Sequence, residues 1–205
     1  MNQPYTFHEM PGMSLKCELI KPDELSRAFD RLASVCTDIV FIDKEGRWLL
    51  AYRVIHSAYG WWWKGGSMRK GETIEQSLSR LMKREIGFMP EGVEPLAHFF
   101  HHWKMRNEAP QENGKHDEIH LHFMKVDDAT IAKIEAGLNP DEYDVVKGMM
   151  RYDGTQDVRP VIAAMYRRYK ALQNHEVREA LRVANEMLTR FGLSTTAHGL
   201  TSLDD

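Results

Sequence analysis

Cysteine, long apolar runs and a leader-like start are all scarce or missing in this sequence. Two of its 205 residues are cysteine, Cys17 and Cys36, too few for a disulfide-framed secreted domain, so we expect reduced thiols and a cytoplasmic protein. No apolar run approaches the roughly 20 residues of a membrane span. The opening MNQPYTFHEM lacks the basic start and apolar centre of a signal peptide. We therefore expect no membrane partner.

A strong charge of one sign is also missing. The net charge is −3, so no broad basic face for nucleic acid is expected. The hydrophobic share of 42% and the charged share of 28% are those of a soluble protein with an ordinary core. We expect an N-terminal extension with a helix at 1–35, a main domain at 36–155, and a C-terminal helical segment with a polar tail at 156–205.

The hydrophobic pattern predicts a mixed α/β domain. A β-branched run at 36–42, a turn at 44–46 and a second apolar run at 47–53 predict a hairpin. Further strands are predicted at 96–103, 118–126 and 143–150. Helices are predicted from Pro22 through Leu32, at 73–86, from Asp127 or Asp128 to 136, and within 156–192 up to a stop at Gly192.

One residue breaks the apolar face of the helix at 73–86. With Ile74 at zero on a helical wheel, Glu85 falls at about 20°, inside the stripe that Leu78 and Leu81 define. A carboxylate there costs several kcal/mol unless it is paired or holds a metal. The alternative is that Glu85, near the helix end, reaches out to water.

The same stretch resembles the signature of the Nudix hydrolase family, G-x5-E-x7-R-E-U-x-E-E-x-G-U, in which U is apolar. Leu81 and Arg84 stand where that signature has two of its acids. The matching positions are Gly66, Glu72, Arg80, Met82, Glu85, Gly87 and Phe88. The resemblance implies a Nudix-type α/β/α sandwich with a mixed sheet, here followed by C-terminal helices.

The departures resemble the GDP-mannose mannosyl hydrolase branch of the family, in which one divalent ion serves instead of several. The hairpin that begins at Asp38 and ends at Arg53, the aromatic run after Gly60, and Tyr143 extend the likeness over residues 36–152. Lys64 and Ser67 depart from it, because the branch has a proline and an arginine there. The implied activity is Mg2+-dependent hydrolysis of a nucleoside diphosphate sugar, with Mn2+ as the alternative ion.

The resemblance also implies a ligand set for that ion. Glu85 and the Gly66 carbonyl are the expected ligands, and Glu118 is a further metal ligand or the general base. Among His116, Glu118, His120 and His122 we take His120 as the base, because histidine titrates near neutral pH. Any of these histidines could instead be a structural residue on a half-buried strand.

Arg53 is expected to clamp the diphosphate, because a guanidinium binds it through two hydrogen bonds; the alternative is a surface arginine. Asp38 is expected at the sugar or base by resemblance, or else as a buried acid that caps a loop. The other expected substrate contacts are a tryptophan from the run 61–63, an arginine and a histidine: Trp62, Arg69 and His102.

Two other functions stay open. One is a Nudix pyrophosphohydrolase that cuts ADP-ribose or a dinucleotide between phosphates, and the other is a non-catalytic domain that senses a nucleotide. In each case the partner is a nucleoside diphosphate-linked small molecule. The apolar positions Ile162, Met165, Tyr169 and Leu172 have helical spacing and are expected to pack a homodimer.

Overall fold

The computed structural model describes residues 21–55, 57–89, 91–174, 179–180, 182–184 and 186–187. The predicted stop at Gly192, the polar tail and the first part of the N-terminal extension lie outside these residues. The elements in chain order are α1 (Pro22–Phe29), β1 (Ser34–Ile42), β2 (Trp48–Arg53), β3 (Gly60–Trp62), β4 (Lys64–Ser67), α2 (Ile74–Ile86), β5 (Glu94–Trp103), the 3-10 turn η1 (Gln111–Asn113), β6 (Lys115–Lys125), α3 (Asp128–Ala136), β7 (Met149–Tyr152) and α4 (Pro160–Leu172).

The strands of the described chain form one mixed seven-stranded sheet, as the α/β expectation requires. Its main order is β3-β2-β1-β6-β5, with β4 paired to β1 and β7 to β2. The central pair, β1 and β6, is parallel, and the other strand pairs are antiparallel. Because β4 and β6 flank β1 from opposite sides, side chains on these two strands are separated by the width of β1.

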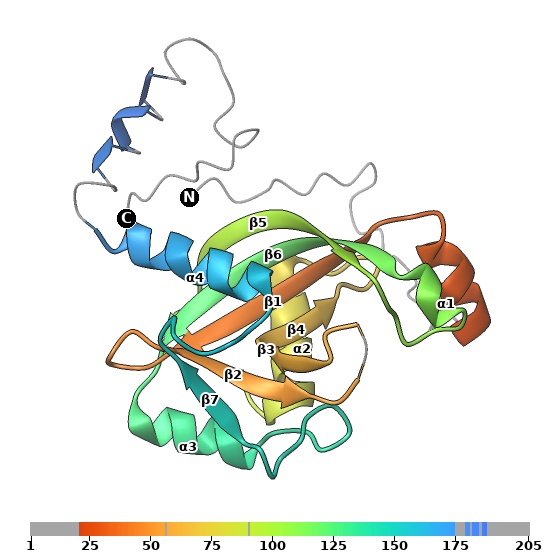
Figure 1. Ribbon diagram of the computed structural model, residues 1–205, viewed down its shortest axis with the longest axis horizontal. Coiled ribbons are helices and arrows are strands. Elements are labelled where there is room, and N and C mark those ends of the chain that lie inside the picture. The colour runs from red at the N-terminus through yellow and green to blue at the C-terminus, as the bar shows by residue number, and fades with distance from the viewer. Residues whose placement is uncertain are drawn as a thin grey trace, which may run out of the picture.

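Helices cover both faces of the sheet, which gives the expected sandwich (Figure 1). On one face, α4 closes a core that contains the tryptophans Trp48, Trp62 and Trp63. On the other face, α2 and α3 close a second core around Ile39, Phe41 and Leu49. Alternate residues of β1 therefore enter different cores, as strand geometry dictates. None of the helices in the described part of the chain has the length and hydropathy needed to cross a membrane.

Most predicted elements are present near the predicted positions, but the strand predicted at 143–150 is wrong. Tyr143 forms only an isolated bridge with Arg53, and the backbone N–H groups of Val146 and Lys147 donate to Asp144 Oδ1. The valines at 145–146 are exposed rather than packed. An aspartate that accepts backbone hydrogen bonds forms a turn despite β-branched neighbours, so the strand begins only at Met149.

The apolar face of α4 packs within the chain. Ile162, Tyr169 and Leu172 are buried in the same core as the tryptophans, and Met165 packs against it. This corrects the interpretation of that face as a dimer surface, because its hydrophobic side chains already cover the sheet. It also adds α4 to the core of the domain that we expected at 36–155.

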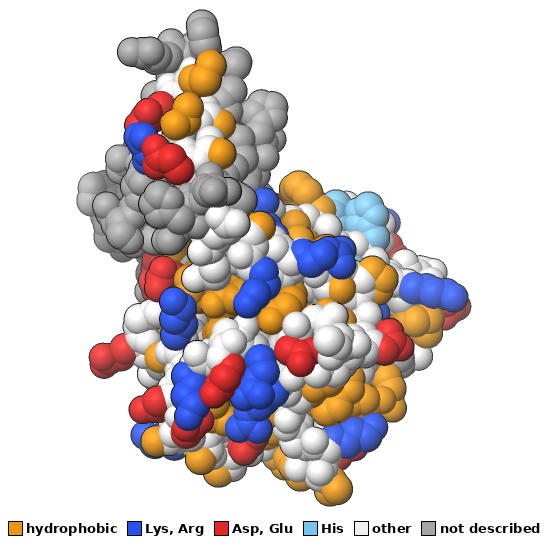
Figure 2. Space-filling model, turned by 60° about the vertical axis from the view of Figure 1, so that its left-hand side comes forward, with side chains coloured by type: hydrophobic (Ala, Val, Ile, Leu, Met, Phe, Trp, Pro, Cys, Tyr) orange, Lys and Arg blue, Asp and Glu red, His pale blue; other side chains and the backbone are white. Residues whose placement is uncertain are grey.

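Charges of both signs are mixed on the surface. On the face that Figure 2 shows, lysine and arginine side chains alternate with aspartate and glutamate side chains instead of forming a patch of one sign. This distribution agrees with the net charge of −3.

Candidate active site

Glu85 lies in the last turn of α2 and is fully buried. Its Oε2 accepts hydrogen bonds from the Gly65 N–H at 3.2 Å and from the Tyr143 hydroxyl, and its Oε1 accepts one from Arg84 at 2.9 Å. The alternative that Glu85 reaches out to water is therefore excluded. The acid on the apolar face is held by donors from β4, α2 and the segment after α3.

Local sequence signals position this helix. The Thr73 hydroxyl accepts the Gln76 N–H at 3.2 Å, and the Gln76 side chain accepts the Thr73 N–H at 2.9 Å, which completes a capping box. At the other end Gly87 adopts a left-handed φ of 81° and ends the helix. Arg80 pairs with Glu72 at 2.5 Å. These two signature residues therefore hold the loop that precedes α2 against the helix.

The carboxylates of Glu85 and Glu142 converge on the guanidinium of Arg84, and Gly66 lies beside it. It contacts Glu85 at 2.9 Å and Glu142 at 3.0 Å, and a Cβ added to Gly66 would lie 3.7 Å from its Nη2. Carboxylate and carbonyl oxygens are the ligands that hard divalent ions prefer. The residues present therefore fit such an ion at the point where the Arg84 cation lies. The Arg84 side chain is 44% exposed, so it can leave.

Two more cations lie next to this point. Lys64 is fully buried, and its Nζ has no hydrogen-bond partner among the described residues. Burial lowers the pKa of Lys64 to about 7, against an attraction to Glu85. The ammonium lies 4.9 Å from the centre of the Tyr143 ring. Arg53 pairs with Glu142 at 3.1 Å. The cluster therefore combines three cations, Arg53, Lys64 and Arg84, with two carboxylates.

Burial also governs the proton affinities of the other acidic groups. It raises the pKa of Glu142, with the negative charge of Glu85 adding to the effect. It raises the pKa of Tyr143 far above the ordinary tyrosine value. The Tyr143 hydroxyl therefore stays protonated and donates its hydrogen bond to Glu85 at any physiological pH.

Asp38 lies beside this cluster but on the other face of β1. Its Oδ2 accepts a hydrogen bond from the indole of Trp63 at 2.6 Å. Burial raises the pKa of Asp38 to about 7. A Cβ on the facing Gly65 would lie 2.2 Å from Asp38 Oδ1, so glycine is required there. Asp38 therefore lies in the tryptophan core. This position resembles the alternative expectation, in which Asp38 is a buried acid of the hairpin.

Glu118 and His120 lie on β6, on the side of β1 opposite to Gly66. His120 and Gly66 are both paired to Thr37 of β1, from opposite sides, so two interstrand spacings of about 4.8 Å separate their backbones. The Thr37 hydroxyl bonds Ser77 of α2 at 2.7 Å, and both residues are fully buried. Thr37 and Ser77 therefore lie between the Gly66 and His120 positions of the sheet. The roles expected for Glu118 as a metal ligand and for His120 as the base stay predictions.

The other histidines near His120 also lie on β5 and β6. Burial lowers the pKa of His120, with His98 adding to the effect, and burial lowers the pKa of His122. The Nδ1 of His122 lies 3.0 Å from the carbonyl oxygen of His120. The ring of His116 lies 4.3 Å from that of His102.

The remaining predicted substrate contacts differ in their exposure. Trp62 is 2% exposed and packs on Trp63 and Trp103, so its ring belongs to the core and Trp61 is the partly exposed member of the run. Arg69 is exposed, with its N–H 2.7 Å from Glu72. His102 is exposed on β5. Trp62 and Trp63 are both buried because the chain breaks its alternation between β3 and β4.

Sequence reasoning missed four members of the cluster as site residues: Lys64, Arg84, Glu142 and Tyr143. Three of them carried a signal. Lys64 and Arg84 were departures from the family pattern, and Tyr143 marked a late segment of the likeness. Glu142 had none, because only the fold brings it next to Arg84.

Comparisons with known proteins identify the family and the fold of this domain. The NUDIX domain family model matches residues 33–169. The chain is 37% identical over 59 residues to an RNA pyrophosphohydrolase from Acinetobacter baylyi, a match that covers 29% of this chain and 34% of that protein. The chain therefore spans about a third of the length of this curated relative.

Two solved structures show the same fold. The MutT protein from Methanosarcina mazei Go1 superposes with a TM-score of 0.51 at 13% identity, over 69% of this chain and 96% of that one. A MutT NUDIX hydrolase from Burkholderia pseudomallei gives 0.50 at 17% identity, over 67% and 98%. With the family match covering most of the chain and including the whole loop–helix–loop that carries Glu85, the chain belongs to the NUDIX domain family.

Proposed function

We propose that the protein hydrolyses a nucleoside diphosphate derivative, in the first place a nucleoside diphosphate sugar such as GDP-mannose, at the cluster around Glu85. The observation that carries this proposal is the unpartnered Lys64 ammonium in a site with more cations than carboxylates. A buried charge without a hydrogen-bond partner is costly. A diphosphate would provide both the charge and the acceptors that Lys64 lacks.

The oxygen donors of Glu85, Glu142 and the Gly66 carbonyl would hold a divalent ion, Mg2+ with Mn2+ as the alternative, once Arg84 swings out. Such an ion neutralises charge on the leaving diphosphate and lowers the pKa of bound water. A single ion matches the donor set, because Leu81 is buried in the core and contributes no oxygen.

The protein side chains would orient the substrate. Tyr143 and the Gly65 N–H fix the Glu85 carboxylate, so its direction is set before substrate arrives. Glu142 fixes Arg53, whose Nε is buried without a partner among the described residues. Arg53 and Lys64 therefore present free donors to an entering anion. A bound diphosphate would raise the pKa of Lys64 and keep it charged near neutral pH.

A group of aromatic rings lies at the end of β2, where Tyr52 precedes Arg53 in the chain. The ring of Tyr52 packs edge-on against Tyr59 and Trp61, at 5.7 and 5.2 Å between ring centres. Tyr59 is 47% exposed. Partly exposed rings of this kind suit stacking on a base or a sugar ring. These residues replace Trp62 in our proposal for substrate stacking.

A second candidate is pyrophosphohydrolysis, in which water attacks phosphorus. The observation that favours it is the 37% identity to an RNA pyrophosphohydrolase. The two reactions share the diphosphate site and differ in the bond that breaks.

The test is hydrolysis of a panel of nucleoside diphosphate sugars, ADP-ribose and dinucleotides with Mg2+ or Mn2+ in 18O-labelled water. We expect turnover of at least one sugar nucleotide, with the label in the sugar. Label in phosphate would assign the second candidate. Glu85→Gln should remove turnover, whereas the matched variant Glu118→Gln should retain it. Binding without hydrolysis of any member would contradict an enzymatic function.

A further inference from the structure

A second group of candidate metal-binding side chains lies on β5 and β6, across β1 from Gly66. His98 of β5 and His120 of β6 are direct cross-strand partners, and Glu118 comes two residues before His120, so all three side chains project from one face of the sheet. Glu118 Oε1 lies 2.8 Å from His98 Nε2 and 3.2 Å from His120 Nε2. The three candidate ligand atoms all lie within 4.8 Å of one another.

These spacings are close to those that a tetrahedral ion imposes. With metal–nitrogen and metal–oxygen distances of about 2.0–2.2 Å, neighbouring ligand atoms lie about 3.3 Å apart. The two contacts to Glu118 differ from that value by only a few tenths of an ångström. A small opening of the group would therefore admit an ion in place of the shared hydrogen bonds.

The backbone keeps the group in place. The paired strands β5 and β6 run from Glu94–Phe123 to Trp103–Lys115, with one irregularity before Ala97. The rings of His98 and His120 stack at 4.6 Å with 17° between their planes, and the Nε2 atoms of both contact the same oxygen, Glu118 Oε1. The side chains are 28–44% exposed. An ion could therefore enter from solvent and keep water in its remaining position.

We propose that His98, Glu118 and His120 form a second cation site, selective for a divalent first-row transition ion such as Zn2+. Two imidazoles and one carboxylate suit Zn2+ and disfavour Mg2+, which prefers oxygen ligands alone. The cluster around Glu85 has the opposite preference. Thr37 and Ser77 lie between the two groups, so each site can be removed while the other stays intact.

The experiment is equilibrium dialysis of chelator-treated protein against Zn2+ at pH 7.5, repeated with Co2+ to record its ligand-field absorption. We expect one ion per chain. His98→Ala, Glu118→Gln and His120→Ala should each weaken binding at least about tenfold and change the Co2+ spectrum. His102 is an exposed histidine on β5, the strand that carries His98. His102→Ala and Glu85→Gln should each leave the Zn2+ affinity within about twofold.

Two results would overturn the proposal: no stoichiometric Zn2+ binding, or binding that all three ligand variants retain. Melting curves identify any variant that fails to fold. His98, at 44% side-chain exposure on the edge strand, provides the test least coupled to folding. Because the readout is ion binding, failure here is distinguishable from failure of the proposed hydrolysis, which Glu85→Gln tests.

Discussion

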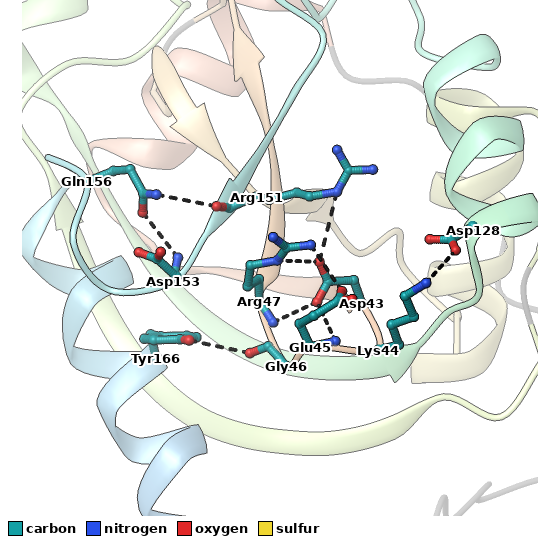
Figure 3. Close-up of polar contacts among 10 residues, drawn as sticks. All are labelled: Asp43, Lys44, Glu45, Gly46, Arg47, Asp128, Arg151, Asp153, Gln156 and Tyr166. Carbon is teal, nitrogen blue, oxygen red and sulfur yellow. Dashed lines mark hydrogen bonds and ion pairs between the residues drawn. The ribbon is translucent and has the colours of Figure 1, made fainter.

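Asp43 and Glu85 are two buried carboxylates at the sheet, and they differ in how their surroundings satisfy them. Asp43, at the turn after β1, accepts the N–H groups of Glu45 and Arg47 at 3.1 and 2.9 Å, and pairs with the Arg47 side chain at 2.7 Å (Figure 3). Arg151 of β7 approaches it at 3.9 Å. These contacts close the β1–β2 turn, and they tie it to β7.

Glu85 is equally buried, but its neighbours are not satisfied. Lys64 Nζ and Arg53 Nε have no hydrogen-bond partner among the described residues, and Arg84 is shared between two carboxylates. Unpaired buried donors cost stability, which supports the proposal that a ligand pairs with these two. The comparison teaches that two equally buried acids can differ in the donors around them, and our proposal rests on that difference.

The largest expected effect is on turnover in Glu85→Gln. The variant keeps the shape of the side chain but removes the charge that holds a divalent ion, so Mg2+-dependent kcat should fall on the order of a thousandfold. Steady-state assays at saturating Mg2+ measure it, with circular dichroism to confirm the fold. Full activity would remove Glu85 from the metal site.

Asp43→Ala should affect stability instead. It leaves two backbone N–H groups and Arg47 without their acceptor, at a cost of about 3 kcal/mol. Urea unfolding measures the loss, and kcat of the folded variant should be unchanged. A tenfold loss of kcat in Asp43→Ala without loss of stability would contradict the structural role that we give to Asp43.

Asp38 supplies a third buried acid, distinguished by its pH dependence. Its pKa of about 7 in the folded protein lies above the ordinary 3.8, so its contribution to stability is full below pH 4 and is lost as the pH rises toward 7. Asp38→Asn keeps an acceptor for Trp63 and stays neutral. Unfolding free energies between pH 4.5 and 7 should fall by roughly 2–4 kcal/mol in the wild type relative to this variant. Parallel pH curves would show that Asp38 is charged when folded.

Lys64→Met should raise the stability of the fold and weaken substrate binding. The substitution removes a buried, unpaired ammonium, so the unfolding free energy should rise by about 1–3 kcal/mol, while KM for the diphosphate substrate should rise about tenfold. Lys44→Met is the matched control, because Lys44 is exposed and pairs with Asp128 beside the Asp43 turn (Figure 3). It should change either quantity little. Equal changes of KM and of unfolding free energy in the two variants would contradict the difference that we draw between Lys64 and Lys44.

The smallest effect is expected for Arg84→Ala. Without the guanidinium that occupies the point between Glu85 and Glu142, Mg2+ should half-saturate the enzyme at a concentration about fivefold lower. Titration of activity with Mg2+ measures this. A higher half-saturating concentration would mean that Arg84 supports the ion rather than competing with it.

The sequence was sufficient for the parts that local patterns govern. The hairpin, the helix that ends before Gly87, and the position of Glu85 on the apolar face of that helix all follow from spacing along the chain. The spacing left open whether Glu85 is buried or reaches water, and the structure buries it. What could not be predicted depends on contacts between distant segments. Glu142 reaches Arg84 only through the turn after α3.

The same limit applies to the grouping of Glu118 with Gly66, which stays a prediction. Alternation along β6 places His120 and His122 on one face, and their pairing with alternate residues of β1 agrees with this. It could not show that β4 and β6 pair with opposite sides of β1, which is a property of strand order.

The central claim is that the cationic side chains around Glu85 bind a diphosphate. The most direct test is titration calorimetry of inorganic pyrophosphate binding in the presence of Mg2+. The account predicts that Lys64→Met weakens binding at least about tenfold while Lys44→Met leaves it unchanged. Equal affinity in the wild type and Lys64→Met would contradict it.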